Sequence, residues 1–221
     1  RLSQEHKYAF ITTIDGGRYW GSDATSVMLT RNRYGTHGHF DCMSMQMFSH
    51  GVVIADDAEG KVTRLGVLSP LLNKVNIQVI SHNTVMVDGR TYPRMKRLPR
   101  TAMWREFGDV HTVIFADREG VRYRGVKELR GIAVTPEYVL DVYEVSSDTP
   151  RCYDWLFHPH ADAKNFRIRQ TFRAGDPGRL PGKKWFSRFR RAAVRDDWCA
   201  TWRIGPTSAR LTMIGAPRTT L

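Results

Sequence analysis

Histidine and aspartate alternate in one short stretch of the chain, at His37, His39 and Asp41. In an extended strand alternate side chains point to the same face, so these three would converge on one small volume. Imidazole and carboxylate groups are both zinc ligands. The spacing therefore predicts a metal site, although two histidines in a polar surface turn would give the same pattern.

Two further stretches favour the metal interpretation, because they place more ligand types beside apolar runs. The run at residues 52–54 leads directly into Asp56 and Asp57, and His82 stands just before a second run at residues 84–87. Runs of this length and composition are typical of strands. A sheet that aligned them would bring their polar ends together.

The order of these segments resembles the heparinase II/III-like family of polysaccharide lyases. The resemblance is carried by Tyr-Gly-Thr-His-Gly-His-Phe-Asp at 34–41, Val-Ile-Ala-Asp at 53–56 and His-Asn-Thr-Val-Met-Val-Asp-Gly at 82–89. Tyr-Asp-Trp-Leu-Phe-His at 153–158 fits the same family, and the similarity extends over about residues 7–160. It implies the β-sheet domain that follows an α/α toroid in that family, and an enzyme that cleaves uronic-acid polysaccharides by β-elimination.

The resemblance also implies a role for each candidate residue. His39, Asp56 and His82 match the ligands of a structural zinc ion, and Asp41 becomes a carboxylate that supports them. His37 matches a histidine that faces the cleft between domains, where it would bind or neutralise the uronate, and it is the catalytic candidate. The family often has a tyrosine after the acidic ligand, and residues 57–81 contain none.

The same resemblance predicts partners and compartment. The main acid and base of the family come from a helical domain N-terminal to this segment, so the chain is expected to be a fragment that is inactive without it. The implied substrate is an acidic polysaccharide such as a glycosaminoglycan or alginate. The implied location is periplasmic or secreted, although no signal peptide is visible in the chain.

The composition is typical of a globular protein, and the net charge favours binding to a polyanion. Hydrophobic residues make up 41% and charged residues 25%, and the net charge is +12. No nucleic-acid motif accompanies that charge, and no apolar run is long enough for a membrane span. A basic, aromatic run at 183–191 would either stack on sugar rings or bases, or form a solvated strand or loop.

The remaining cysteines and histidines are expected to be structural. Cys42 is predicted to be a small buried hydrophobe, whereas Cys152 and Cys199 could pair. The isolated histidines expected to have structural roles are His111, His158 and His160. Neither a serine-hydrolase elbow nor a phosphate-binding glycine loop occurs.

A hydrophobic period of two dominates the chain and predicts an all-β fold, either a sandwich or a large layered sheet. The family resemblance implies the antiparallel layered β-sandwich. We expect one domain over residues 1–221, with a Gly- and Pro-rich loop near 175–182. The strands predicted are 8–13, 26–31, 43–47, 52–54, 77–80, 84–87, 102–107, 111–116, 121–127, 131–134, 138–145, 152–158, 200–204 and 211–214.

Three functions are compatible with these features. The first is the β-sheet domain of a lyase with a structural zinc. The second is a non-catalytic module that grips anionic glycans through its basic surface. The third is a metal-dependent hydrolase, which would need an open zinc position beside its substrate.

Overall fold

The computed structural model describes residues 8–12, 24–31, 39–57, 75, 77–160, 162–176, 178, 189–215 and 219–220. Their regular structure is almost entirely β, which confirms the all-β prediction. His37 and most of the basic run at 183–191 lie outside the described residues. Within the described part of the chain, no helix is long and apolar enough to cross a membrane.

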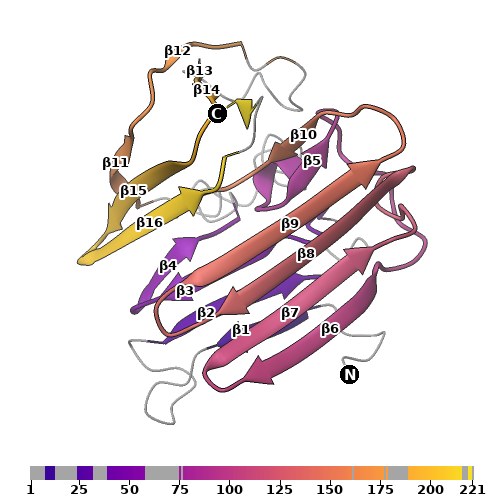
Figure 1. Cartoon of the computed structure of the whole chain (residues 1–221), viewed down its shortest axis with the longest axis horizontal. Coiled ribbons are helices and arrows are strands. Elements are labelled where there is room, and N and C mark those ends of the chain that lie inside the picture. The colour runs from indigo at the N-terminus through magenta and orange to yellow at the C-terminus, as the bar shows by residue number, and fades with distance from the viewer. Residues whose placement is uncertain are drawn as a thin grey trace, which may run out of the picture.

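Two antiparallel four-stranded sheets form the main body. The first contains β1 (Tyr8–Thr12), β2 (Thr25–Thr30), β3 (Met45–Ser49) and β4 (Val52–Ala55) in that order. The second contains β6 (Arg100–Phe107), β7 (Val110–Asp117), β8 (Val126–Val134) and β9 (Val139–Ser147), again in chain order. Figure 1 shows the second sheet lying across the first as a separate layer.

The main hydrophobic core lies between these layers. Val27 and Leu29 of β2 belong to the same buried cluster as Val113, Phe115 and Ile132 of the second sheet. Along β8 the even-numbered residues are buried, as expected for a strand with one face on the core. The layered sandwich thus follows from the period of two in the sequence.

Shorter elements complete the fold. β5 (Val85–Val87) follows the 3₁₀ turn η3 (Val79–Ser81) and pairs with β10 (Tyr153–Trp155). A C-terminal sheet contains β11 (Lys164–Ile168), β15 (Trp198–Ile204) and β16 (Thr207–Met213). The two-residue strands are β12 (Arg173–Ala174), β13 (Arg190–Arg191), β14 (Ala193–Val194) and β17 (Thr219–Thr220).

The C-terminal sheet has a second core, built around Trp198 and Trp202. Met47 and Phe157 pack against this cluster and also against the main core. These two side chains therefore join the C-terminal sheet to the sandwich.

Two predicted strands are wrong. Residues 77–80 give way to η3, because the N–H of Ser81 bonds to the carbonyl of Gln78 and its hydroxyl bonds to that of Val75. Residues 121–127 and 131–134 are not two strands, since β8 runs unbroken from Val126 and residues 118–125 form a loop. The Asp117 carboxylate shapes that loop by accepting the N–H groups of Glu119, Val121 and Arg122.

Two further features are a turn after β5 and the state of the cysteines. The Asp88-Gly89 turn is present, with φ of 53° and 63°, and a single antiparallel bridge joins Val87 to Arg90 across it. The strand that pairs with β5 is β10. Cys42 is buried as predicted, and Cys152 and Cys199 are free thiols.

Candidate metal and substrate site

The centre of the site is a contact between His82 and Asp57. His82 ends η3, its side chain is fully buried, and its Nδ1 lies 3.1 Å from Oδ2 of Asp57. Asp57 comes from the segment directly after β4 and also accepts hydrogen bonds from Ser44 Oγ and Gln46 Nε2, each 3.2 Å long. Burial acts to raise the pKa of Asp57, but these bonds and the charge of His82 outweigh it and lower that pKa. Asp57 is therefore an oriented, ionised carboxylate.

His39 and Asp41 lie beside this pair. The ring centroids of His39 and His82 are 5.6 Å apart, with the rings tilted by 59°. Burial raises the pKa of Asp41 to about 6, while the charge of His82 opposes that rise and the charge of Asp57 adds to it. Asp41 Oδ1 is buried and has no hydrogen-bond donor among the described residues. Two imidazoles and two carboxylates thus share one polar region.

The structure brings together part of the predicted ligand set. His39 and His82 are neighbours, as expected. The carboxylate in contact with His82 belongs to Asp57, because adjacent residues at a strand end point in opposite directions. Asp56 contributes its backbone, donating to the carbonyl of His158. The assignment of Asp56 as a ligand stays a prediction, and the geometry favours Asp57 in that place.

The donor set fits a zinc ion in part. Two ligand atoms on a tetrahedral zinc lie ~3.3 Å apart, close to the contact between His82 and Asp57. Within the described ranges, no three histidine, cysteine or acidic side chains converge as a complete metal centre. His39 would have to turn toward the pair to complete a three-ligand set.

Asn83 holds the strand ends around this site. Its buried amide donates to the carbonyls of Met45, 3.0 Å away, and Asp56, 3.1 Å away. Its Oδ1 accepts the N–H of His158 at 2.5 Å. One side chain therefore ties β3, the end of β4 and the segment after β10 to the residue next to His82.

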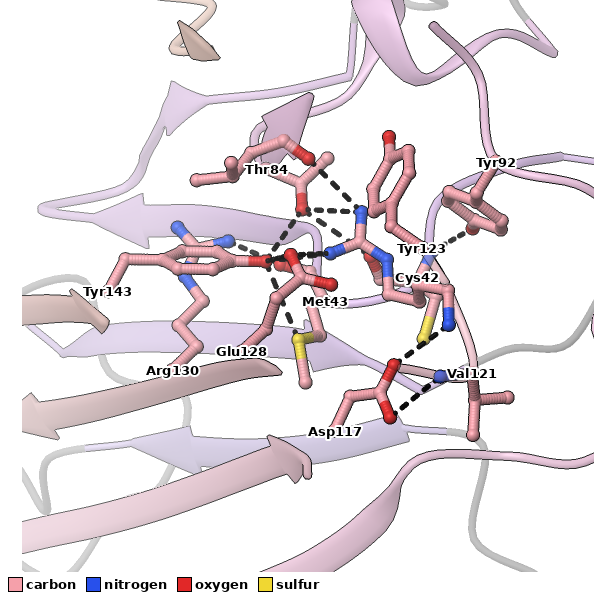
Figure 2. Close-up of polar contacts among 12 residues, drawn as sticks. Cys42, Met43, Thr84, Tyr92, Asp117, Val121, Tyr123, Glu128, Arg130 and Tyr143 are labelled. Carbon is pink, nitrogen blue, oxygen red and sulfur yellow. Dashed lines mark hydrogen bonds and ion pairs between the residues drawn. The ribbon is translucent and has the colours of Figure 1, made fainter. Parts of the chain in front are cut away.

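Two fully buried arginines, Arg122 and Arg130, donate hydrogen bonds to backbone carbonyls of the segment at residues 83–85. Figure 2 shows Arg130 beside the Tyr143 ring. Arg122 forms an ion pair with Glu128 at 2.7 Å and donates to the carbonyl of Val85 at 3.2 Å. Arg130 forms an ion pair with Asp141 at 2.8 Å and donates to the carbonyl of Asn83 at 2.6 Å. Both arginines thus donate hydrogen bonds to the segment that carries His82.

The family of the chain follows from its match to a known protein-family model. Residues 13–210 match the family described as heparinase II/III-like, C-terminal. The chain belongs to this family. The resemblance read from the sequence motifs is thereby confirmed, and it extends well beyond residue 160. None of the curated protein sequences matches the chain significantly.

Solved structures of heparinases share the fold of this heparinase II/III-like chain. A heparinase III gene product aligns with a TM-score of 0.55 and 12% identity, covering 97% of this chain and 42% of its own length. A second heparinase III aligns at 0.56 and 11% identity, covering 96% and 34%. Heparan sulfate lyase HepC from Pedobacter heparinus aligns at 0.54 and 14% identity, covering 83% and 26%. The chain therefore spans less than half the length of these enzymes.

The motifs of this family member do not identify Asp57 as the partner of His82, nor do they identify the two buried arginines. A signal for the arginines is present in β8, where Glu128 and Arg130 occupy the inward positions between Val126 and Ile132. Charged residues at core-facing positions are rare unless they are paired. The neighbouring strand β9 also alternates in burial, and it carries Asp141, the ion-pair partner of Arg130.

Proposed function

We propose that the chain is the β-sheet part of a polysaccharide lyase that cleaves uronic-acid-containing polysaccharides by β-elimination. The observation that carries this proposal is the contact between His82 and Asp57, with the His39 ring beside it, in a member of the heparinase II/III-like family. Membership supports the class of enzyme, and the net charge of +12 suits an acidic polymer.

β-Elimination sets clear demands on the protein. A base removes the proton beside the uronate carboxylate, the electron pair forms a carbon–carbon double bond, and the bond to the leaving oxygen breaks as an acid protonates that oxygen. The negative charge that develops on the carboxylate must be neutralised. We assign this neutralising role to His37. The acid and base belong, in this proposal, to a helical domain that joins this chain in the same enzyme.

We further propose a structural zinc ion held by His39, His82 and Asp57, with Asp41 as a supporting carboxylate. A zinc ion there would cross-link three segments that are distant in sequence and contribute to folding stability. Asp57 takes the place that the family resemblance gave to Asp56, because its carboxylate contacts His82.

The proposed location is the periplasm or the exterior of the cell. Uronic-acid polysaccharides are polymers that an enzyme meets outside the cytoplasm, and the family resemblance implies the same compartment. Fractionation of the producing cell would test the assignment, and activity confined to the cytoplasm would contradict it.

Ultraviolet absorbance tests the activity, because the new double bond is conjugated with the carboxylate and absorbs light. The enzyme as its gene encodes it should generate this absorbance from a glycosaminoglycan or alginate. His37→Ala should reduce turnover and leave zinc content unchanged. The exposed turn residue His50 gives a matched control, since His50→Ala should change neither. If the wild-type enzyme binds the polysaccharide and never produces the absorbance, the lyase assignment fails.

The net charge of +12 favours one second candidate, a non-catalytic module that binds anionic glycans. Such a module would bind the polysaccharide with an affinity that falls steeply with salt. The absorbance assay separates it from a lyase, because binding alone forms no double bond.

A further inference from the structure

Arg130 connects the two sequence segments that form the candidate site. Its side chain is fully buried in the core face of β8. One guanidinium nitrogen, Nη1, donates to the carbonyls of both Met43 and Asn83. The other two nitrogens, Nε and Nη2, hold the Asp141 carboxylate at 2.9 and 2.8 Å. The guanidinium also lies over the Tyr143 ring, 5.2 Å from its centroid, as Figure 2 shows. These contacts together fix the plane of the guanidinium.

The two carbonyls that Arg130 holds flank the His82–Asp57 contact. Asn83 directly follows His82. Met43 directly precedes Ser44, whose hydroxyl donates to the Asp57 carboxylate. A shift of either backbone segment would therefore change the distance or the angle between His82 and Asp57.

Met43 supplies a second observation. Its φ is +62°, in the left-handed region that non-glycine residues rarely adopt. Such a conformation persists only where the surroundings enforce it. The bond from Arg130 to the Met43 carbonyl is one of these constraints, and the bond from the Met43 N–H to the Thr30 carbonyl is another.

We propose that Arg130 is a positioning residue of the site, which sets the orientation of His82 relative to Asp57. It contacts neither the proposed zinc ion nor a substrate. A planar guanidinium can hold a carboxylate and two carbonyls at once, whereas a lysine ammonium is a point charge that cannot span them. The inference concerns the site of the proposed function, but the orientation of His82 can be measured whether or not that function is correct.

The test compares Arg130→Lys with Ile132→Ala, in the protein as its gene encodes it. Ile132 occupies the next inward position of β8 and is buried in the main core, so its truncation destabilises the same strand. The first readout is the nitrogen NMR spectrum of the His82 imidazole in metal-free protein, at a pH above the imidazole pKa. The second readout is zinc affinity, measured by competition with a chelator.

We expect wild-type His82 to occupy one tautomer with the proton on Nδ1, facing the Asp57 carboxylate. Arg130→Lys should give signals averaged over both tautomers and reduce zinc affinity by about 10- to 100-fold, the usual effect of losing a group that orients a ligand. Ile132→Ala should lower the melting temperature and leave both readouts close to wild type.

Two results would overturn the proposal. One is a wild-type imidazole spectrum in Arg130→Lys, and the other is an equal change in Ile132→Ala, which would mean that any loss of stability disturbs His82. If Arg130→Lys does not fold, Asp141→Asn tests the same point, because it loosens the Arg130 side chain without removing it. Asp141→Asn should shift the tautomer ratio in the same direction. If wild-type protein binds no zinc while the tautomer result holds, the zinc assignment fails and the role of Arg130 stands.

Discussion

Nδ1 of His82 and Oδ2 of Asp57 lie 3.1 Å apart, although His82 follows η3 and Asp57 follows β4. Both side chains are largely buried, with 0% and 11% of their surfaces exposed. At this distance the pair either shares one hydrogen bond or gives two ligands to one metal ion. The first two predictions separate these states.

Removal of His82 should remove the metal. Purified wild-type protein is expected to carry about one zinc ion per chain, and His82→Ala is expected to carry almost none. The variant should also melt at a lower temperature, since a structural metal contributes directly to folding stability. Elemental analysis and calorimetry measure the two effects. Full zinc occupancy in His82→Ala would refute the assignment.

The two adjacent aspartates should differ in their effect on zinc. Asp57→Asn is expected to weaken zinc binding by at least about tenfold, because this carboxylate contacts His82. Asp56→Asn should change the affinity only a few-fold, because its observed hydrogen bonds are made by its backbone. Chelator competition on both variants gives the comparison. The reverse order would restore the ligand set implied by the sequence.

Stability should depend on pH through Asp154. Burial raises the pKa of Asp154, and the nearby charge of Asp88 raises it further. The folded protein therefore resists ionisation of this group, and its stability falls as pH rises from below the unfolded pKa of roughly 4 to above the folded pKa. Asp154→Asn should match wild type near pH 3 and be the more stable protein at pH 7. Urea unfolding at both pH values measures this, and a variant equally or less stable at pH 7 would contradict it.

Removing one partner of the buried ion pair between Arg122 and Glu128 should destabilise the fold more than removing both charges. Arg122→Met is expected to lower the free energy of unfolding by about 3–5 kcal/mol, because it leaves a buried carboxylate without its charge partner. Arg122→Met with Glu128→Gln should regain part of that loss, since the uncompensated charge is gone. Denaturant titration of both variants gives the values. A double variant no more stable than the single one would show that the lost bonds to Thr84 and Val85 dominate.

Two turn glycines should differ in their tolerance of a methyl group. Gly108 and Gly120 both have positive φ, +57° and +64°. A Cβ on Gly108 would meet nothing within 4 Å, whereas one on Gly120 would lie 2.9 Å from the Tyr123 carbonyl oxygen. Gly108→Ala should cost about 1–2 kcal/mol of conformational strain. Gly120→Ala should cost clearly more, and equal losses in thermal unfolding would mean that the loop adjusts freely.

The sequence predicts the fold through its period of two and its turn residues. Hairpins closed by Gly108 and by Thr135-Pro136 occur where the pattern places them. The loop at 118–125 is not predicted, because its apolar residues have the pattern of a strand. In the structure the Asp117 carboxylate accepts three of its N–H groups and holds it as a loop. A local side-chain bond of this kind competes with strand pairing.

The site is less predictable than the fold. Motif spacing identifies His39 and His82, because ligand type and order are visible along the chain. The choice between Asp56 and Asp57 depends on which way the chain turns after β4, and β3 and β4 carry a register shift next to Met47. The two carbonyl partners of Arg130, those of Met43 and Asn83, lie in two other segments, so no local pattern reveals them.

The long sequence separation of these partners has a consequence for folding kinetics. β6 to β9 pair only with chain neighbours, so this meander closes short loops and is expected to form early. Arg130 reaches its carbonyl acceptors only when residues 43 and 83 dock on it. The site would then assemble after the transition state, and weakening the Arg130 contacts would accelerate unfolding far more than it slowed folding.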